Sequence, residues 1–213
     1  MFSINGKEFI WKALMSLIGI TLISFGAALS QTMNMGLDPF TAINTGASEL
    51  LGFTLGNYQL FVNAAILAII LFFDRKIIGW GTIFNLVLVG YMIEFFISML
   101  ESFIDPTQFA FIVQLLITVV AILIFTFGVA LYMDADLGVS PYDAIAPVIT
   151  DRVSASYKTV RMIQDIVVVI TAWILGGPVG VSTFITGFLA GPLIDFFSNR
   201  FTRKLSDKVE AKA

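Results

Sequence analysis

The segment MGLDPFTAINTG at residues 35–46 recurs as LGVSPYDAIAPV at residues 137–148. A shift of 102 positions pairs the turn residues of the two copies, Gly36 with Gly138, Pro39 with Pro141 and Phe40 with Tyr142. Flanking matches extend the duplication, among them Phe25-Gly26 with Phe127-Gly128 and, at a shift of 101, Gly79 with Gly180, Thr82 with Thr183 and Gly90 with Gly191. Glycines and prolines repeated in the same order are far more specific than apolar matches. The pattern therefore predicts two homologous halves, residues 1–104 and 105–199, followed by a basic tail at 200–213.

The composition places these halves in a membrane. The chain has 213 residues, of which 58% are hydrophobic and only 13% charged, with a mean hydropathy of +0.93. Soluble domains average roughly 45–50% apolar and about 25% charged residues, so an integral membrane protein is indicated. The chain contains no His and no Cys, which excludes zinc sites built on those ligands, a thiol nucleophile and a histidine base. Any chemistry must rest on Asp, Glu, Lys, Arg, Tyr, Ser, Thr and backbone groups. We expect no metal site, no cofactor and no enzymatic activity.

Apolar runs predict an all-α polytopic protein. Six of them are long enough to cross the ~30 Å hydrocarbon layer as helices, at residues 9–31, 57–73, 80–100, 109–133, 157–175 and 179–197. Two others, at residues 39–51 and 141–153, are too short to span and are expected to form re-entrant helices. Each half then has three transmembrane helices and one short helix.

The number of crossings decides how the halves are related. Three crossings in each half place the halves in opposite orientation, as a 3+3 inverted repeat. If the short helices span, the halves are parallel instead. In the inverted arrangement all twelve Lys and Arg residues lie on the cytoplasmic side, as the positive-inside rule requires, whereas the parallel one moves Arg75 and Lys76 outside. We favour the inverted arrangement, in the cytoplasmic membrane, with both termini and the basic tail in the cytoplasm.

Sequence motifs point to a family. The turn at residues 36–40 and its copy at residues 138–143 resemble the glycine–proline–aromatic–aspartate signature of the YczE/YyaS/YitT group of bacterial membrane proteins. Residues 176–183 and 191–195 are similar to the end of the YczE-type members. The first half departs from the signature, because Thr41 stands where the signature has Asp and an acid, Asp38, precedes the proline. The resemblance implies a polytopic protein of the bacterial cytoplasmic membrane and brings no established substrate.

The two proline turns are candidate parts of a binding site. Pro39 follows Asp38, and Pro141 follows Ser140, which is a common way to start a helix. If these helices start inside the membrane, their unpaired N–H groups face a polar cavity, and broken helices at matching positions of two halves are the best sequence pointer to a transport site. The alternative is that they only begin two short helices. We assign Asp38, Pro39, Thr41, Ser140, Pro141 and Tyr142 to the candidate substrate site.

Ionisable residues at membrane depth complete that candidate site. Asp143, Arg161 and Asp165 fall in apolar segments, where a charge costs roughly 2.5–3.5 kcal/mol on insertion scales and therefore marks a cavity or a partner. Arg161 and Asp165 are four residues apart on one helix face and are expected to pair. Asn63 is the repeat counterpart of Asp165. In the alternative interpretation, Arg161 snorkels to the inner interface.

These features favour a small secondary transporter or facilitator, in which Asp143 or Asp165 carries a proton or a cation. The alternative is a non-transporting membrane partner that stabilises or recruits another protein. An intramembrane aspartyl protease is disfavoured because the chain lacks a second motif of that kind, and a channel is not distinguished from a carrier. The expected partners are the lipid bilayer and an unknown small molecule or ion, with no nucleic acid. Whether the chain forms a homodimer is left open.

Overall fold

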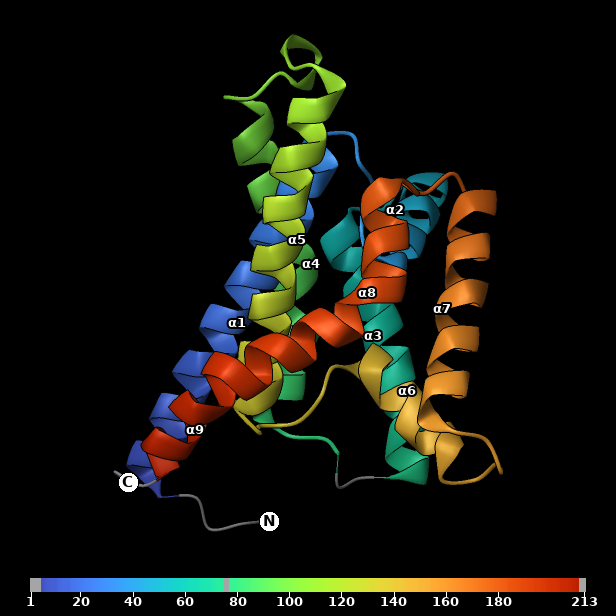
Figure 1. The fold of residues 1–213 in the computed structure, drawn as a ribbon. Helices are drawn as coiled ribbons and strands as arrows, with labels where there is room; N and C mark the ends of the chain where they lie inside the picture. The colour runs from blue at the N-terminus through green and yellow to red at the C-terminus, as the bar shows by residue number, and fades with distance from the viewer. Residues whose placement is uncertain (1–4, 75–76, 211–213) are drawn as a thin grey trace.

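The fold is a bundle of helices, seen in a computed structural model that describes residues 5–74 and 77–210 (Figure 1). Every regular element in this part of the chain is helical. In chain order the α-helices are α1 (Gly6–Thr32), α2 (Pro39–Leu51), α3 (Leu55–Phe73), α4 (Trp80–Glu101), α5 (Phe111–Asp134), α6 (Pro141–Thr150), α7 (Tyr157–Ile174), α8 (Val181–Phe197) and α9 (Arg203–Glu210). A short 3-10 turn, η1 (Pro106–Gln108), precedes α5, and a π-helical turn, η2 (Ser198–Thr202), joins α8 to α9.

All six predicted membrane spans form helices. Five helices are long and apolar enough to cross a membrane: α1, α3, α4, α5 and the continuous helix that runs from α8 into α9. The sixth predicted span, α7, is less apolar than these five helices. Its 18 residues include three charged ones, Lys158, Arg161 and Asp165. A helix of 18 residues rises about 27 Å, so its length nevertheless approaches the thickness of the hydrocarbon layer. The chain is therefore a polytopic α-helical membrane protein.

The two short helices begin where the proline turns predict. The Asp38 side chain accepts a hydrogen bond from the Thr41 N–H at 3.1 Å, which caps the start of α2. The Ser140 hydroxyl accepts one from the Asp143 N–H, also at 3.1 Å, and caps α6. Each cap satisfies one of the N–H groups that a helix start leaves unpaired. α2 is 13 residues long and α6 is 10.

Helices α1 and α5 pack closely against each other through glycines. A Cβ atom built on Gly26 would lie 2.6 Å from the Ala121 carbonyl oxygen and 2.8 Å from the Phe125 nitrogen. One built on Gly128 would lie 2.8 Å from both the Gly19 carbonyl oxygen and the Ile23 nitrogen. Residue numbers in α5 fall as those in α1 rise along this contact, so the two helices are antiparallel. The two sets of contacts also correspond under the 102-residue shift.

The loops before α2 and α6 bind the opposite half in matching ways. The Ser182 N–H donates to the Met35 carbonyl at 2.8 Å, and its counterpart, the Gly81 N–H, donates to the Leu137 carbonyl at 2.7 Å. A second matching pair of bonds joins Leu37 N–H to the Pro178 carbonyl (3.0 Å) and Val139 N–H to the Ile77 carbonyl (3.3 Å). Each proline loop is thus fixed by the start of the last long helix of the other half.

The segment after α8 is more ordered than the sequence suggested. The predicted basic tail at 200–213 begins inside η2, and its residues 203–210 form α9, which contacts α1 (Figure 1). The Asp134 carboxylate, at the end of α5, accepts hydrogen bonds from the Ser198 hydroxyl at 2.9 Å and from the Thr202 hydroxyl. These bonds attach the helical extension to the rest of the bundle.

The loop between α4 and α5 gives a pH prediction. The Asp105 carboxylate accepts hydrogen bonds from the Thr107 hydroxyl (2.7 Å) and the Thr107 N–H (2.9 Å), and these bonds lower the pKa of Asp105 below its ordinary value of 3.8. A depressed pKa means that this turn is stabilised at neutral pH and loses that contribution as pH falls through the folded pKa. A carboxyl NMR titration should place the Asp105 pKa below 3.8, and Thr107→Val should raise it. An unchanged pKa in that variant would contradict the assignment.

Candidate functional site

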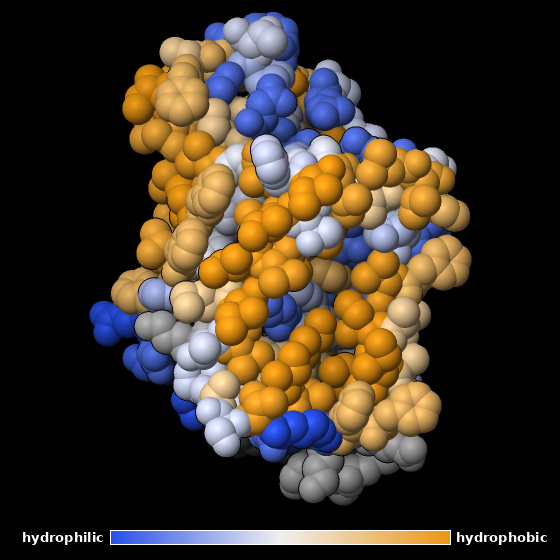
Figure 2. Space-filling view, turned by 90° about the vertical axis from the view of Figure 1, so that its right-hand side faces the viewer, coloured by the Kyte–Doolittle hydropathy of each residue, from blue (hydrophilic) through white to orange (hydrophobic). Residues whose placement is uncertain are grey.

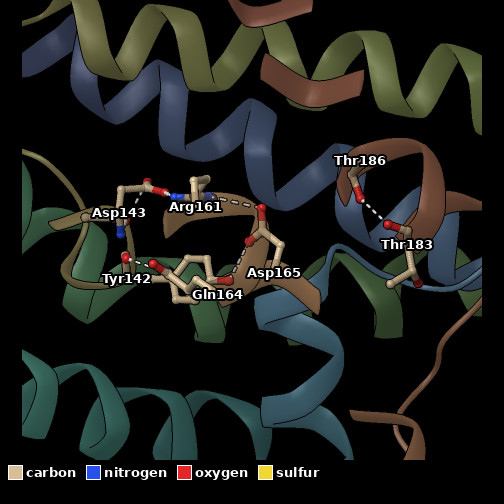
Figure 3. A network of polar contacts seen from close by, with 8 residues as sticks. Tyr142, Asp143, Arg161, Gln164, Asp165, Thr183 and Thr186 are labelled. Atoms are coloured by element: carbon tan, nitrogen blue, oxygen red, sulfur yellow. Dashed lines mark hydrogen bonds and ion pairs between the residues drawn. The ribbon is translucent and has the colours of Figure 1, made fainter. Parts of the chain in front are cut away.

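Three charged side chains meet between α6 and α7. The Arg161 guanidinium donates through Nη1 to Asp143 Oδ1 at 2.7 Å and through Nε to Asp165 Oδ2 at 3.1 Å (Figure 3). Asp143 lies in the first turn of α6, and the other two residues lie in the first half of α7. The hairpin formed by α6, the loop at 151–156 and α7 brings them together. We call Asp143, Arg161 and Asp165 the charged triad.

Neutral polar groups complete the hydrogen bonding of the triad. The Ser140 hydroxyl donates to Asp143 Oδ2 at 2.6 Å, and the Tyr142 hydroxyl donates to Asp165 Oδ1 at 2.6 Å. The Gln164 amide donates to the Tyr142 carbonyl at 3.1 Å and helps to hold α6 against α7 (Figure 3). Every carboxylate oxygen of the triad therefore has a donor. A buried ion pair is tolerated under this condition.

The triad carries a formal charge of −1, because one guanidinium faces two carboxylates. Its side chains are only partly accessible, at 31% for Asp143, 28% for Arg161 and 15% for Asp165. A partly accessible cluster with a residual negative charge favours a positive charge nearby.

An aromatic pair connects this site to the other half. The rings of Phe40 in α2 and Tyr142 in α6 are stacked, with centroids 4.4 Å apart and an interplanar angle of 20°. The Arg161 guanidinium carbon lies 4.9 Å from the centroid of the Tyr142 ring, within cation–π range. The starts of the two short helices thus meet at this stack, beside the charged triad.

The counterpart of the triad in the first half is neutral. The repeat offset matches Asp143, Arg161 and Asp165 with Thr41, Gln59 and Asn63. Asn63 is 1% exposed and Gln59 is 2% exposed. Within the described chain, neither polar atom of the Asn63 amide nor Gln59 Oε1 has a hydrogen-bond partner. Leaving such atoms unsatisfied costs about 1–3 kcal/mol each.

The structure gathers most of the predicted site residues. Ser140, Pro141, Tyr142, Asp143, Arg161 and Asp165 form one cluster, and the predicted pairing of Arg161 with Asp165 is present. Asp38 and Pro39 lie at the start of α2, where one carboxylate oxygen of Asp38, Oδ2, has no hydrogen-bond partner among the described residues. Asn63 lies in α3, and it takes no part in the hydrogen bonds described above for the triad.

Three contributors were not predicted as site residues: Phe40, Gln59 and Gln164. The repeat contains a signal for the first two, since Phe40 matches Tyr142 and Gln59 matches Arg161. Nothing in the sequence distinguishes Gln164 from other helical glutamines.

A shallow, almost wholly apolar groove lies on the outside of the bundle beside the triad. It lies between α7 and α8, has a volume of about 180 Å³, and is lined by Asp165, by Thr183 and by apolar side chains that include Ile166, Ile170 and Phe188. Figure 2 looks onto the side of α7 and shows hydrophobic side chains over most of the middle of this face, with a small hydrophilic area between them. Among residues 5–74 and 77–210, no group of three or more acidic side chains could hold a metal ion.

Comparison with known families gives the chain a classification. Residues 10–199 match a family described as "Family of unknown function (DUF6198)". The chain belongs to this family. The match covers both halves, including the two proline turns and all three triad residues.

The curated relatives are similar over nearly their whole length. The chain is 27% identical to the uncharacterized membrane protein YczE of Bacillus subtilis (strain 168) over 84% of this chain and 81% of the relative. It is 25% identical to an uncharacterized protein of Haemophilus influenzae (88% and 83%) and 24% identical to the uncharacterized protein YyaS of B. subtilis (84% and 89%). The predicted resemblance to YczE and YyaS is confirmed, and so is the assignment to the membrane. No solved structure matches this DUF6198 member.

Proposed function

We propose that this protein is a small secondary transporter or facilitator of the cytoplasmic membrane, with no catalytic role. Its substrate site is the region around the charged triad and the Phe40–Tyr142 stack. The observation that carries the proposal is the triad itself, a polar network with one uncompensated negative charge at the start of a short helix. Polar groups at membrane depth are retained where they serve a pathway or a relay.

We further propose that the two halves form an inverted repeat and that α2 and α6 are re-entrant. The antiparallel crossing of α1 and α5 supports the inversion, as do the matched hydrogen bonds of the two proline loops. Helices of 13 and 10 residues rise only about 20 and 15 Å, which is shorter than the hydrocarbon layer. Their starts meet at the Phe40–Tyr142 stack, where a site near the bilayer midplane would lie in a transporter of this type.

The triad supplies a simple coupling mechanism. With both carboxylates ionised the site is negative, and uptake of one proton by Asp165 or Asp143 makes it neutral. Arg161 stays charged and holds the remaining carboxylate. Binding of a proton and release of a cation can therefore alternate at the same place.

We predict that Asp165→Asn abolishes proton-coupled flux. Proteoliposomes containing a pH-sensitive dye would be challenged with a panel of small cations, anions and neutral solutes under an imposed pH gradient. The wild type is expected to couple proton movement to at least one solute class, and the variant to lose most of that signal because residue 165 can no longer bind a proton. Asp195→Asn, at an exposed position in α8, is the matched control and should behave as the wild type.

Two results would contradict this prediction. Unchanged coupling in Asp165→Asn would remove that residue from the mechanism. Absence of flux for all solutes, combined with full cellular activity after neutralisation of Asp143 and Asp165, would favour the non-transporting partner instead.

A further prediction concerns the side of the membrane on which the connection between α3 and α4 lies. Lys76 lies outside the described residues, in the connection between α3 and α4, and the chain contains no cysteine to give background labelling. In the inverted arrangement, Lys76→Cys should be protected from an impermeant maleimide in intact cells and react after permeabilisation. Labelling from outside would make the short helices true spans and the halves parallel, and the midplane site would be abandoned.

A further inference from the structure

We propose that η2 and α9 form an interfacial surface that binds phospholipids with anionic headgroups. The exposed apolar side chains of this surface insert beside the acyl chains, and a row of cations next to them contacts the headgroup phosphates. The surface contains no residue of the charged triad, so this inference goes beyond the proposed function and does not depend on it.

The position of α9 places it at the boundary of the bilayer. It continues the last candidate span, which runs over 28 residues from Val181 to Lys208. Such a helix rises about 42 Å, more than the ~30 Å hydrocarbon layer, so its charged end reaches the headgroups. α9 also contacts α1, and Figure 1 shows it beside the beginning of α1. There α1 exposes Lys7 and Trp11, and basic and tryptophan residues are typical of the membrane–water interface.

The surface of η2 and α9 has a buried row and an apolar row. Thr202 and Ser206 are only 1% and 6% exposed and face the bundle. Phe201 and Leu205, each one position earlier, are 52% and 47% exposed. Residues four positions apart share a helix face, so the two large apolar side chains form a continuous row beside the buried one.

A row of cations borders the apolar row on the side away from the bundle. It consists of Arg200, Lys204 and Lys208, which are all exposed, and we call it the basic row. At 3.6 residues per turn, Lys204 and Lys208 lie about 100° and 60° from Leu205 around the helix axis, in the direction opposite to Ser206. Among the described residues, none forms an ion pair with the basic row. Its charges are therefore free to contact an anionic group outside the protein.

The bundle holds this surface in one orientation. The Asp134 carboxylate at the end of α5 accepts hydrogen bonds from the Ser198 and Thr202 hydroxyls. These bonds keep Thr202 against the bundle, which leaves Phe201 and the basic row facing outward. A helix with apolar side chains beside Lys and Arg binds a membrane interface through buried apolar area and through attraction to anionic lipids.

The combination of the two outward rows identifies the ligand as an anionic lipid. Free phosphate would neutralise the basic row but would leave Phe201 and Leu205 uncovered. A zwitterionic lipid would cover the apolar row without supplying a net negative charge. An acidic soluble protein would have to cover both rows at a place where α9 already lies beside the bilayer. A phospholipid with a negative headgroup fits both rows at once.

The test places one tryptophan in the apolar row of the full-length protein. Phe201→Trp is made in a chain whose Trp11, Trp80 and Trp173 are replaced by Phe, and the protein is reconstituted into bilayers. Quenching by brominated phosphatidylglycerol and by brominated phosphatidylcholine gives the ratio of the binding constants of the two lipids at this position. Phosphatidylglycerol is expected to bind on the order of tenfold more tightly or better, since each cation near an anionic surface contributes about fivefold. Leu205→Trp in the same background repeats the measurement from the neighbouring turn.

A matched pair of variants tests the basic row. Lys204 and Arg203 are adjacent and both exposed, but Arg203 lies about 160° from Leu205 around the helix axis, away from the apolar row. Lys204→Gln should lower the preference for phosphatidylglycerol about fivefold, and Arg203→Gln should leave it unchanged. Added KCl should lower the preference of the unsubstituted row as well, because salt screens exposed charges.

Three results would overturn the inference. Equal quenching by the two lipids at both tryptophan positions would show that the cations only orient the chain in the membrane. Equal losses in Lys204→Gln and Arg203→Gln would assign the preference to net charge and not to the basic row. Absence of quenching by either lipid would place α9 in water and favour an acidic soluble partner.

Discussion

Replacing Arg161 with leucine is expected to destabilise the folded protein by about 2–4 kcal/mol, less than the roughly 3–5 kcal/mol typical of a fully buried ion pair, because the side chains of the triad are partly accessible. The change leaves Asp143 and Asp165 facing each other without the guanidinium that now bonds to both, at 2.7 and 3.1 Å. Two ionised carboxylates without a counter-ion repel each other, so they separate unless one of them takes up a proton. The contact between α6 and α7 should therefore be weakened. Unfolding in mixed micelles, followed by tryptophan fluorescence, measures the loss.

Companion variants identify the cause as charge. Arg161→Lys keeps one positive charge but cannot donate from a planar fork to two carboxylates, so it should recover only part of the stability. The triple variant Arg161→Gln, Asp143→Asn and Asp165→Asn removes all three charges, and it should fold better than Arg161→Leu alone. It should also have no proton-coupled flux. If Arg161→Leu matches the wild type in stability, the triad does not hold the hairpin together.

The boundaries of the short helices show what local sequence determines. The sequence predicts a short helix at residues 39–51, and α2 has the same bounds. Asp38 and Pro39 define its start, and Gly52, in a left-handed conformation, ends it. The predicted helix at 141–153 ends earlier, at Thr150. No glycine marks that end, and the chain must turn early enough to place α7 against α6.

The candidate site shows what local sequence leaves out. The pairing of Arg161 with Asp165 follows from their spacing of four residues within one helix. The bond from Arg161 to Asp143 spans 18 residues and depends on the geometry of the hairpin. The Phe40–Tyr142 stack depends on how the two halves dock, and the α7–α8 groove depends on how two helices of the second half pack, so neither periodicity nor a motif could predict them.

Alanine at Gly138 is expected to cause a loss of similar size at the junction of the two halves. Gly138 has φ +102°, and a Cβ there would lie 2.5 Å from the Gly79 nitrogen and 2.6 Å from the Thr82 hydroxyl. The substitution combines backbone strain of about 1–2 kcal/mol with overpacking of about 1–3 kcal/mol, so roughly 2–5 kcal/mol of stability should be lost. The same denaturation assay measures it.

Two other glycines with positive φ allow the cost of the steric clash to be separated from the cost of backbone strain. Gly52 and Gly176 also have positive φ, at +71° and +74°, but a Cβ on either meets no atom within 4 Å. Alanine at these positions should cost only the strain, about 1–2 kcal/mol. If Gly138→Ala is no worse than Gly176→Ala, the close approach of its loop to the start of α4 contributes nothing to stability.

The repeat adds a stricter requirement to this prediction. Gly36 has φ +85°, and its Cβ would lie 2.5 Å from the nitrogen of Gly180, the counterpart of Gly79. If the halves dock as an inverted repeat, Gly36→Ala and Gly138→Ala break equivalent contacts and should lose similar amounts of stability. The double variant should lose the sum, because the two loops bind opposite halves without a shared partner. A large loss at one glycine and none at the other would show that only one of the two junctions holds the halves together.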